Sequence, residues 1–207
     1  MSDTPEAVPP AETLIIELDP PVEVGKIKYA RIELREPTLS QVRDAHMRLD
    51  DPVMSSLGAQ RDYELTFVAA VSKLPRPAAD ALPVRALRQA VAYLEEWVKA
   101  PLPDAPNADE TRFVLLLDPP IKAPNGGVVA ELVLREPTGG ELRQAEELLG
   151  KQPAPLPGPT RRYQMRLIEL VAGVSPLVAG QLPIGKAREA VRFLEGFERS
   201  AQATTTR

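Results

Sequence analysis

The sequence contains a second, diverged copy of itself. The segment LDPP at 18–21 recurs at 117–120, and LREPT at 34–38 recurs at 134–138. When positions 30–99 are compared with positions 130–199, 21 of the 70 pairs are identical. Unrelated segments of this composition would share far fewer identities. The chain is therefore a tandem duplication of a unit of about 85 residues, a period longer than that of small solenoid repeats.

The duplication predicts how the chain is divided. The two repeats are placed at 13–99 and 112–197. Residues 100–111 between them are rich in proline and acidic residues, which is typical of a semi-stiff solvated linker. Residues 1–12 and 198–207 are predicted to be disordered tails.

Each repeat opens with a pattern typical of a β-hairpin. In the first, Leu14, Ile16 and Leu18 share one face of a strand while Ile15 points away. In the second, Asn125-Gly126 is a strong signal for a tight turn. Its first strand, FVLLL at 113–117, is apolar on both faces. We therefore expect something other than the repeat's own helices to cover its outward side chains.

Helical patterns follow each hairpin. Thr38 with Gln41, and Thr138 with Glu141, have the spacing of a capping box at the start of a helix. Two more amphipathic helices are predicted in each repeat, and the last begins after the Leu-Pro pair at 82–83 or 182–183. The predicted fold class is α+β, with two tandem copies of a β-hairpin followed by three α-helices.

A lone two-stranded hairpin is only marginally stable in water. Two copies in one chain offer a remedy, because their hairpins could join across a pseudo-twofold axis as in a fused homodimer. We take this dimer-like arrangement as a hypothesis for the relation between the repeats.

Composition excludes most reactive chemistry. The chain has no cysteine and one histidine, His46, so disulfides, thiolate zinc sites and multi-histidine metal sites are ruled out. No phosphate-binding or dinucleotide-binding glycine motif is present. We expect no enzymatic activity, no cofactor and no metal. The net charge of −4 argues against a nucleic-acid partner, and no apolar run approaches the roughly 20 residues of a membrane span.

The best candidates for a partner-binding surface are aliphatic residues that a single repeat cannot bury. These are Ile15, Val114 and Leu116, because an apolar patch left uncovered must meet another surface. Arg35 and Arg135 stand where a strand leads into a helix, each followed by a glutamate. They are interpreted either as a polar rim around that surface or as a local ion pair and helix cap.

The order of features resembles the tail assembly chaperones of contractile-tailed phages, the Mu-like and related family. The resemblance rests on the opening strand that ends in LDPP, the return strand that ends in LREPT, and the capped helix and amphipathic helices that follow. It covers roughly 13–99 and again 112–197. Family members are usually a single such unit, whereas this chain is a fused pair. Two states therefore stay open: a chain that still forms a homo-oligomer, and one in which the fusion replaces a dimer.

The resemblance implies a non-enzymatic function. The protein would bind the tape measure protein, keep it soluble during tail assembly, and be displaced as tail tube subunits polymerise. It would act in the bacterial host cytoplasm and be absent from the mature virion. The main alternative is a structural adaptor of the phage tail or baseplate. A weaker one, a regulatory protein with a nucleic-acid partner, conflicts with the nearly neutral repeats.

Overall fold

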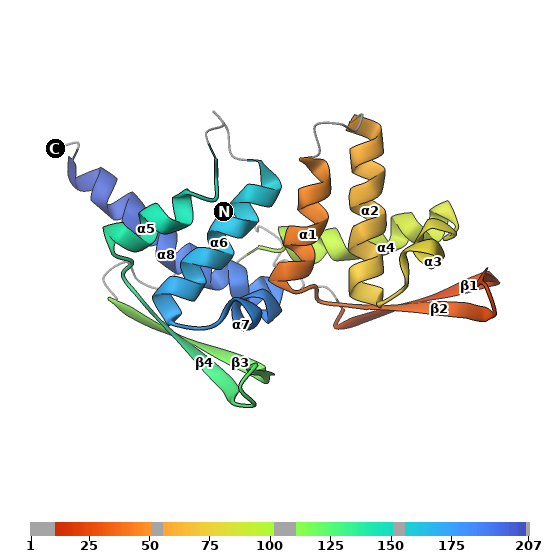
Figure 1. Cartoon of the computed structure of the whole chain (residues 1–207), viewed down its shortest axis with the longest axis horizontal. Helices are drawn as coiled ribbons and strands as arrows, with labels where there is room; N and C mark the ends of the chain where they lie inside the picture. The colour runs from red at the N-terminus through yellow and green to blue at the C-terminus, as the bar shows by residue number, and fades with distance from the viewer. Residues whose placement is uncertain (1–10, 51–55, 102–110, 151–155, 206–207) are drawn as a thin grey trace, which may run out of the picture.

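The computed structural model of the chain describes residues 11–50, 56–101, 111–150 and 156–205. Two units follow one another with the same order of elements (Figure 1). The first unit consists of β1 (Thr13–Val24), β2 (Ile27–Arg35), α1 (Leu39–Leu49), α2 (Ser56–Ser72), α3 (Arg76–Asp80) and α4 (Val84–Lys99). The second consists of β3 (Arg112–Lys122), β4 (Val128–Arg135), α5 (Gly139–Glu146), α6 (Pro157–Ala172), α7 (Pro176–Gln181) and α8 (Ile184–Thr205). The predicted α+β class and the two hairpin-and-helix copies are confirmed.

The structure adds one short helix to each unit, α3 and α7, which the sequence patterns did not predict. Pro176 stands in the first turn of α7, and the Ser175 hydroxyl accepts a hydrogen bond from the Val178 N–H. Proline and a serine cap favour a helix start. Helices of five or six residues are too short to produce a recognisable apolar period, which is why the prediction missed them.

The predicted connectors fall mostly on residues that the structure does not describe. Most of the tail at 1–12 and of the linker at 100–111 lies outside the described residues. The segment 198–207 differs, because α8 continues through it as far as Thr205. The stretch at 151–160 contains four prolines, and α6 begins within it at Pro157. Proline is tolerated in the first turn of a helix, so this start is compatible with the sequence.

Each hairpin forms its own antiparallel two-stranded sheet. Ile16 pairs with Ile32, and Leu115 pairs with Leu132, so the buried side chains lie opposite each other on the inner face. The register shifts at the LDPP segment in both hairpins. Prolines there have no N–H to donate to the ladder, which explains why regular pairing stops at that point.

The hypothesis that the hairpins join across a pseudo-twofold axis is wrong. They share no strand pairing and lie as two separate projections on the same side of the helices (Figure 1). Within each unit the second and last helices cover the hairpin, α2 and α4 in the first and α6 and α8 in the second. Because each inner face is covered locally, a larger sheet is not needed.

The predicted capping boxes are present in both units. The Thr38 hydroxyl accepts a hydrogen bond from the Gln41 N–H, and the Gln41 side chain accepts one from the Thr38 N–H. Thr138 and Glu141 repeat this exchange at the start of α5. Gln41 also donates to the Ala70 carbonyl at 2.9 Å and thereby ties α1 to α2. The start of the first helix is thus positioned by residues that the sequence analysis identified.

The two units pack together through α1, which lies against α6, α7 and α8 of the second unit. The backbone takes part directly: the Leu39 N–H donates to the Leu182 carbonyl at 2.9 Å, and the Ile184 N–H donates to the Pro37 carbonyl at 2.8 Å. Buried apolar side chains from both units form one continuous cluster. The chain therefore has a shared core although its two sheets are separate.

Candidate protein-binding surface

The outer faces of the hairpins carry the aliphatic side chains singled out from the sequence. Ile15, Val114 and Leu116 are all exposed, and Leu116 has 64% of its surface accessible. They alternate along their strands with the buried residues Ile16 and Leu115, as the two-residue period of a strand requires. Among the described residues, nothing in the chain covers them fully.

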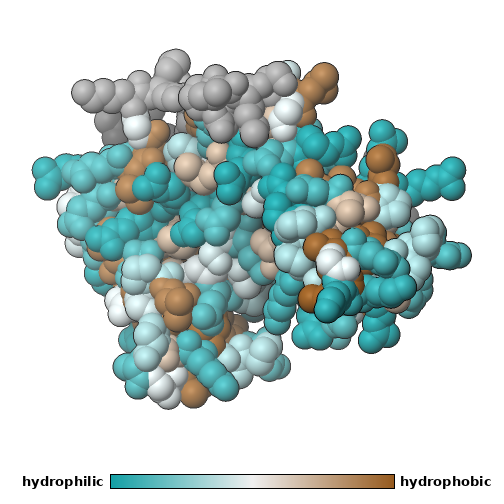
Figure 2. Space-filling model, turned by 45° about the vertical axis from the view of Figure 1, so that its right-hand side comes forward, coloured by the Kyte–Doolittle hydropathy of each residue, from teal (hydrophilic) through white to brown (hydrophobic). Residues whose placement is uncertain are grey.

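The hairpin of the second unit carries several aliphatic side chains on its outer face. Val114 lies opposite Val133, and Leu116 lies opposite Glu131. Val128 is exposed nearer the turn, opposite Lys122. We call the set of Val114, Leu116, Val128 and Val133 the aliphatic face. Figure 2 shows apolar side chains at the surface of the projecting lower-left lobe, where this hairpin lies.

The hairpin of the first unit is charged at the matching positions. Glu17, Lys28 and Glu33 stand where the second unit has Leu116, Val128 and Val133. Lys28 and Glu23 form an ion pair at 2.6 Å, and Glu33 accepts a hydrogen bond from Arg35 Nε at 3.0 Å. Ile15 is consequently an isolated aliphatic side chain among charges.

The structure therefore divides the predicted candidates between two separate sheets. Val114, Leu116 and Arg135 share the outer side of one hairpin, while Ile15 and Arg35 share that of the other. Sequence reasoning missed Val128 and Val133. Comparison of the repeats at an offset of 100 could have found them, because each replaces a charged residue of the first repeat with valine.

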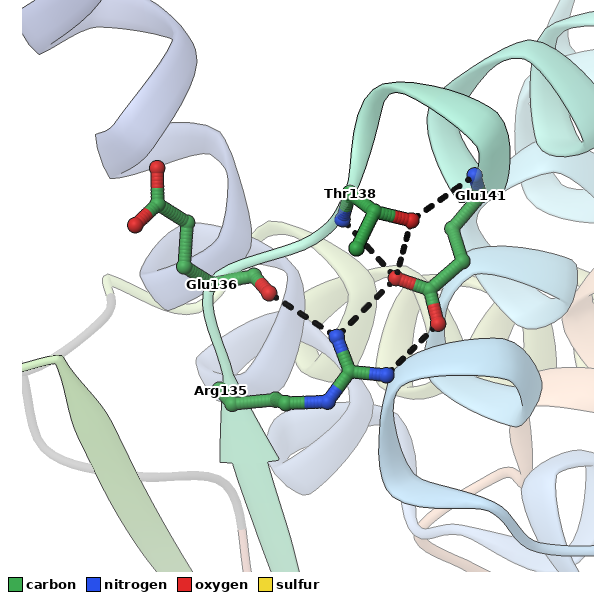
Figure 3. A network of polar contacts seen from close by, with 4 residues as sticks. All are labelled: Arg135, Glu136, Thr138 and Glu141. Carbon is green, nitrogen blue, oxygen red and sulfur yellow. Dashed lines mark hydrogen bonds and ion pairs between the residues drawn. The ribbon is translucent and has the colours of Figure 1, made fainter.

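Arg135 lies at the end of the aliphatic face and belongs to a network around the start of α5 (Figure 3). It donates to Glu141 Oε1 at 2.6 Å and to the Glu136 carbonyl at 3.0 Å. Glu141 in turn accepts a hydrogen bond from the Thr138 N–H at 2.8 Å. The hydrogen bonds from Arg135 lower the pKa of Glu141 to about 2. Arg135 thus supports the helix cap, while the Glu136 side chain points away from it.

Arg35 makes different contacts from its counterpart. It pairs with Glu33 on the same strand and lines a polar hollow of about 280 Å³ together with Ser72 and Lys73. Its neighbour Glu36 turns toward the second unit and accepts a 2.7 Å hydrogen bond from the Gly185 N–H. The expected local pair of Arg35 with Glu36 is therefore replaced by these two separate contacts.

No reactive constellation accompanies the surface. A cavity of about 340 Å³ beneath the tip of the second hairpin is lined by uncharged residues, among them Ala123, Val129 and Val174. Within the described ranges, no group of three or more potential metal ligands is found. Across those same ranges, no helix combines the length and the hydropathy that a membrane crossing requires.

His46 has a structural environment. Its ring stacks on Tyr63 with centroids 5.5 Å apart, and its Nδ1 atom is buried without a hydrogen-bond partner. Burial, with a smaller contribution from Arg161, lowers the pKa of His46 to about 4. The imidazole is therefore neutral near pH 7 and packs in the region where the two units meet.

One family of known proteins matches the chain. The family described as phage tail assembly chaperone proteins, E, or 41 or 14, matches residues 15–98, which include nearly all of the first unit. The resemblance seen in the sequence is thereby confirmed, and the second unit repeats the same elements in the same order. Comparison with curated proteins gave no match, and comparison with solved structures gave none either.

Proposed function

Starting from a first repeat that belongs to the phage tail assembly chaperone family, we propose that this protein binds the tape measure protein and keeps it soluble while the tail is assembled. The family is one of chaperones, and its members serve tail assembly through contacts with other proteins. We further propose that the protein acts in the host cytoplasm and is released before the virion is complete.

The aliphatic face of the second hairpin is the observation that supports this proposal most directly. It exposes Val114, Leu116 and Val128 on one side of a two-stranded sheet whose other side is buried. Exposed apolar side chains grouped on one sheet face are costly to leave in water. A long apolar helical partner would lay the apolar side of its helix across this face, as amphipathic helices do when they bind an apolar surface.

The two repeats have different outer hairpin surfaces, so they are suited to different roles. The first hairpin retains ion pairs on its outer side, while the second has aliphatic residues at the same positions. One unit can therefore provide the scaffold and the other the binding surface. A transient contact suits such a small face, because hydrophobic stabilisation scales with buried apolar area at about 25 cal/mol per Å².

The first repeat supplies the variants for the test. Leu116→Glu, Val128→Lys and Val133→Glu give the second hairpin the residues that the first hairpin carries at those positions. We expect the triple variant to lose co-purification with coexpressed tape measure protein and to leave that protein in the insoluble fraction. The control is Ile15→Glu, an exposed aliphatic position on the other hairpin, which should retain binding.

Two outcomes would contradict the proposal. The first is a triple variant that folds, as judged by an unchanged unfolding midpoint, and still binds the tape measure protein. The second is detection of the chain in purified virions at a fixed copy number. That result would instead favour a structural adaptor of the tail or baseplate.

A further inference from the structure

The contact between the units is heterologous: each unit contributes a different surface to it. The first unit contributes the outer side of α1, which we call the donor face, with Glu36, Ser40, Arg43 and Met47. The second contributes the acceptor face, formed by the starts of α6 and α8 together with α7, with Gly158, Arg161, Gly180, Ile184 and Gly185. Arg188 at the edge of this face donates to the Trp97 carbonyl of α4. In the described residues, α5 makes no comparably extensive contact with the first unit.

Because the units are repeats, each molecule has a second copy of each face, which we call unused because, among the described residues, it does not pack against the other unit in this way. The unused acceptor face lies on α2, α3 and α4 of the first unit. Ile184 is fully buried in the used interface, whereas Val84 at the same position is 55% exposed. Arg161 and Arg188 are retained as Arg61 and Arg88, which are exposed.

The unused donor face lies on α5. It retains Glu136 and Arg143, the counterparts of Glu36 and Arg43, and both are exposed. In the used interface, Glu36 caps the start of α8 through the Gly185 N–H, and Arg43 lies 3.4 Å from the Met165 sulfur. The donor face of the second unit therefore keeps the charged groups that make these contacts in the first.

Two of the exchanges between the used and the unused faces are compatible with the same docking. At the used interface a Cβ on Gly180 would lie 3.2 Å from Ser40 Cβ, so little space is left. On the unused faces, Asp80 stands in place of Gly180 and Gly140 stands in place of Ser40. The glycine is therefore on the donor face instead of the acceptor face. Gly185, which faces Glu36, is replaced by Arg85, which would face Glu136 as an ion pair of opposite charges.

We infer that a second copy of this chain occupies each unused face, with α5 of one molecule docked on α2, α3 and α4 of the next, in the arrangement that the two units display within one chain. The two unused faces lie toward opposite ends of the long axis of the molecule (Figure 1). A heterologous contact of this kind does not close within a pair, so association extends to a ring or an open filament.

Charge governs the strength of this association. The unused acceptor face exposes Arg61, Arg85 and Arg88 beside Asp80, and the unused donor face exposes Glu136 and Glu147 beside Arg143, so positive charge prevails on one face and negative charge on the other. Two apolar contributors to the donor face are absent, because Gly139 and Glu147 replace Leu39 and Met47. The contact between molecules is therefore weaker than that between the units, and added salt opposes it, since exposed charges are screened over about 8 to 10 Å near physiological ionic strength.

A charge exchange tests which residues meet. Sedimentation velocity of the full chain at about 0.05 M salt should show species larger than a monomer that grow with protein concentration and shrink at about 0.5 M salt. Arg85→Glu and Glu136→Arg should each remain monomeric, because each creates a pair of like charges at the junction. The double variant, and an equimolar mixture of the two single variants, should regain association. Both positions are exposed, so the unfolding midpoints should stay near that of the wild type.

The remaining outcomes separate this interface from other surfaces. A wild-type chain that stays monomeric at low salt and high concentration would overturn the inference. So would single charge variants that still associate, or a double variant that fails to recover. The control is Leu116→Glu on the aliphatic face, which should leave self-association unchanged. If it abolished self-association, the contact would run through the hairpin instead of α5.

Discussion

The carboxylate of Glu36 in the first unit accepts a 2.7 Å hydrogen bond from the backbone N–H of Gly185, in the first turn of α8 in the second. Asp50 makes the equivalent contact at the other end of α1, where it accepts a 2.9 Å hydrogen bond from the Gly158 N–H at the start of α6. Free N–H groups at a helix start attract negative charge. The two units are thus joined by carboxylates of the first unit that cap helices of the second, in addition to the shared apolar core.

Removal of the Glu36 carboxylate should weaken the contact between the units. Glu36→Ala leaves the Gly185 N–H without its acceptor in a half-buried position, and we expect a loss of about 1 to 3 kcal/mol in the free energy of unfolding. Glu36→Gln keeps an acceptor and loses only the charge, so its cost should be under about 1 kcal/mol. Denaturant unfolding measures both. The control is Glu136→Ala at the exposed counterpart, and an equal loss there would refute the role of the cross-unit bond.

Gly158 should not tolerate a side chain. A Cβ at this position would lie 3.0 Å from Met47 Cα and would also collide with the Asp50 carboxylate and the Met47 sulfur. Because a backbone atom is involved, rotation of a side chain cannot relieve the crowding. We expect Gly158→Ala to destabilise the chain by about 1 to 2 kcal/mol, despite the better helix propensity of alanine.

The control for Gly158 is Gly196→Ala in α8, where an added Cβ meets no heavy atom within 4 Å. That change should stabilise the helix by about 0.5 to 1 kcal/mol. Thermal unfolding of both variants distinguishes crowding at the interface from a general effect of replacing glycine in a helix. Stabilisation by Gly158→Ala would show that α1 and α6 can separate slightly at no cost.

Local features of the fold could be predicted from the sequence, because they depend on residues close together in the chain. Thr38 and Gln41 are three residues apart, and Gly126 directly follows the asparagine of its turn. The capping box and the turn were therefore both predicted correctly. The cross-unit contacts were not predictable in this way. Glu36 and Gly185 are 149 residues apart, and Glu136, identical to Glu36, is exposed. Sequence identity between the repeats cannot indicate which copy is used.

The candidate surface was only partly predictable for a similar reason. The alternation of Val114 and Leu116 with buried residues follows directly from the strand period. The contribution of Val133 depends on the register that places it opposite Val114. Arg35 does form a local ion pair, but with Glu33 instead of Glu36. Glu36 has its partner in the other unit, and only the packing of the two units makes that partner available.

The stability of the protein should fall as the pH decreases from 6.5 to about 4. The folded chain keeps His46 neutral with a pKa of about 4, whereas the unfolded chain has the ordinary value of 6.5. Between these values the unfolded state binds more protons, so protonation favours unfolding, by at most about 3 kcal/mol. Arg161 and Glu95 also face this ring and act in opposite directions. Denaturant unfolding across this pH range should show a flatter profile for His46→Gln than for the wild type, and parallel profiles would exclude His46 as the cause.

The ion pair of Arg135 with Glu141 should stabilise the second unit at neutral pH and lose its effect in acid. The pKa of Glu141 in the folded chain is about 2, below its ordinary value of 4.5. Its contribution is therefore complete above pH 4.5 and disappears as the pH falls through about 2. Gln41 stands at this position in the first unit, so Glu141→Gln preserves the capping box and removes only the charge. We expect a loss of about 1 kcal/mol at pH 7, less than the pKa shift alone would give, because Arg135 is about half exposed and water screens the pair. The difference from the wild type, measured by thermal unfolding, should shrink below pH 4.5, whereas a constant difference at all pH values would indicate a loss of packing instead of charge.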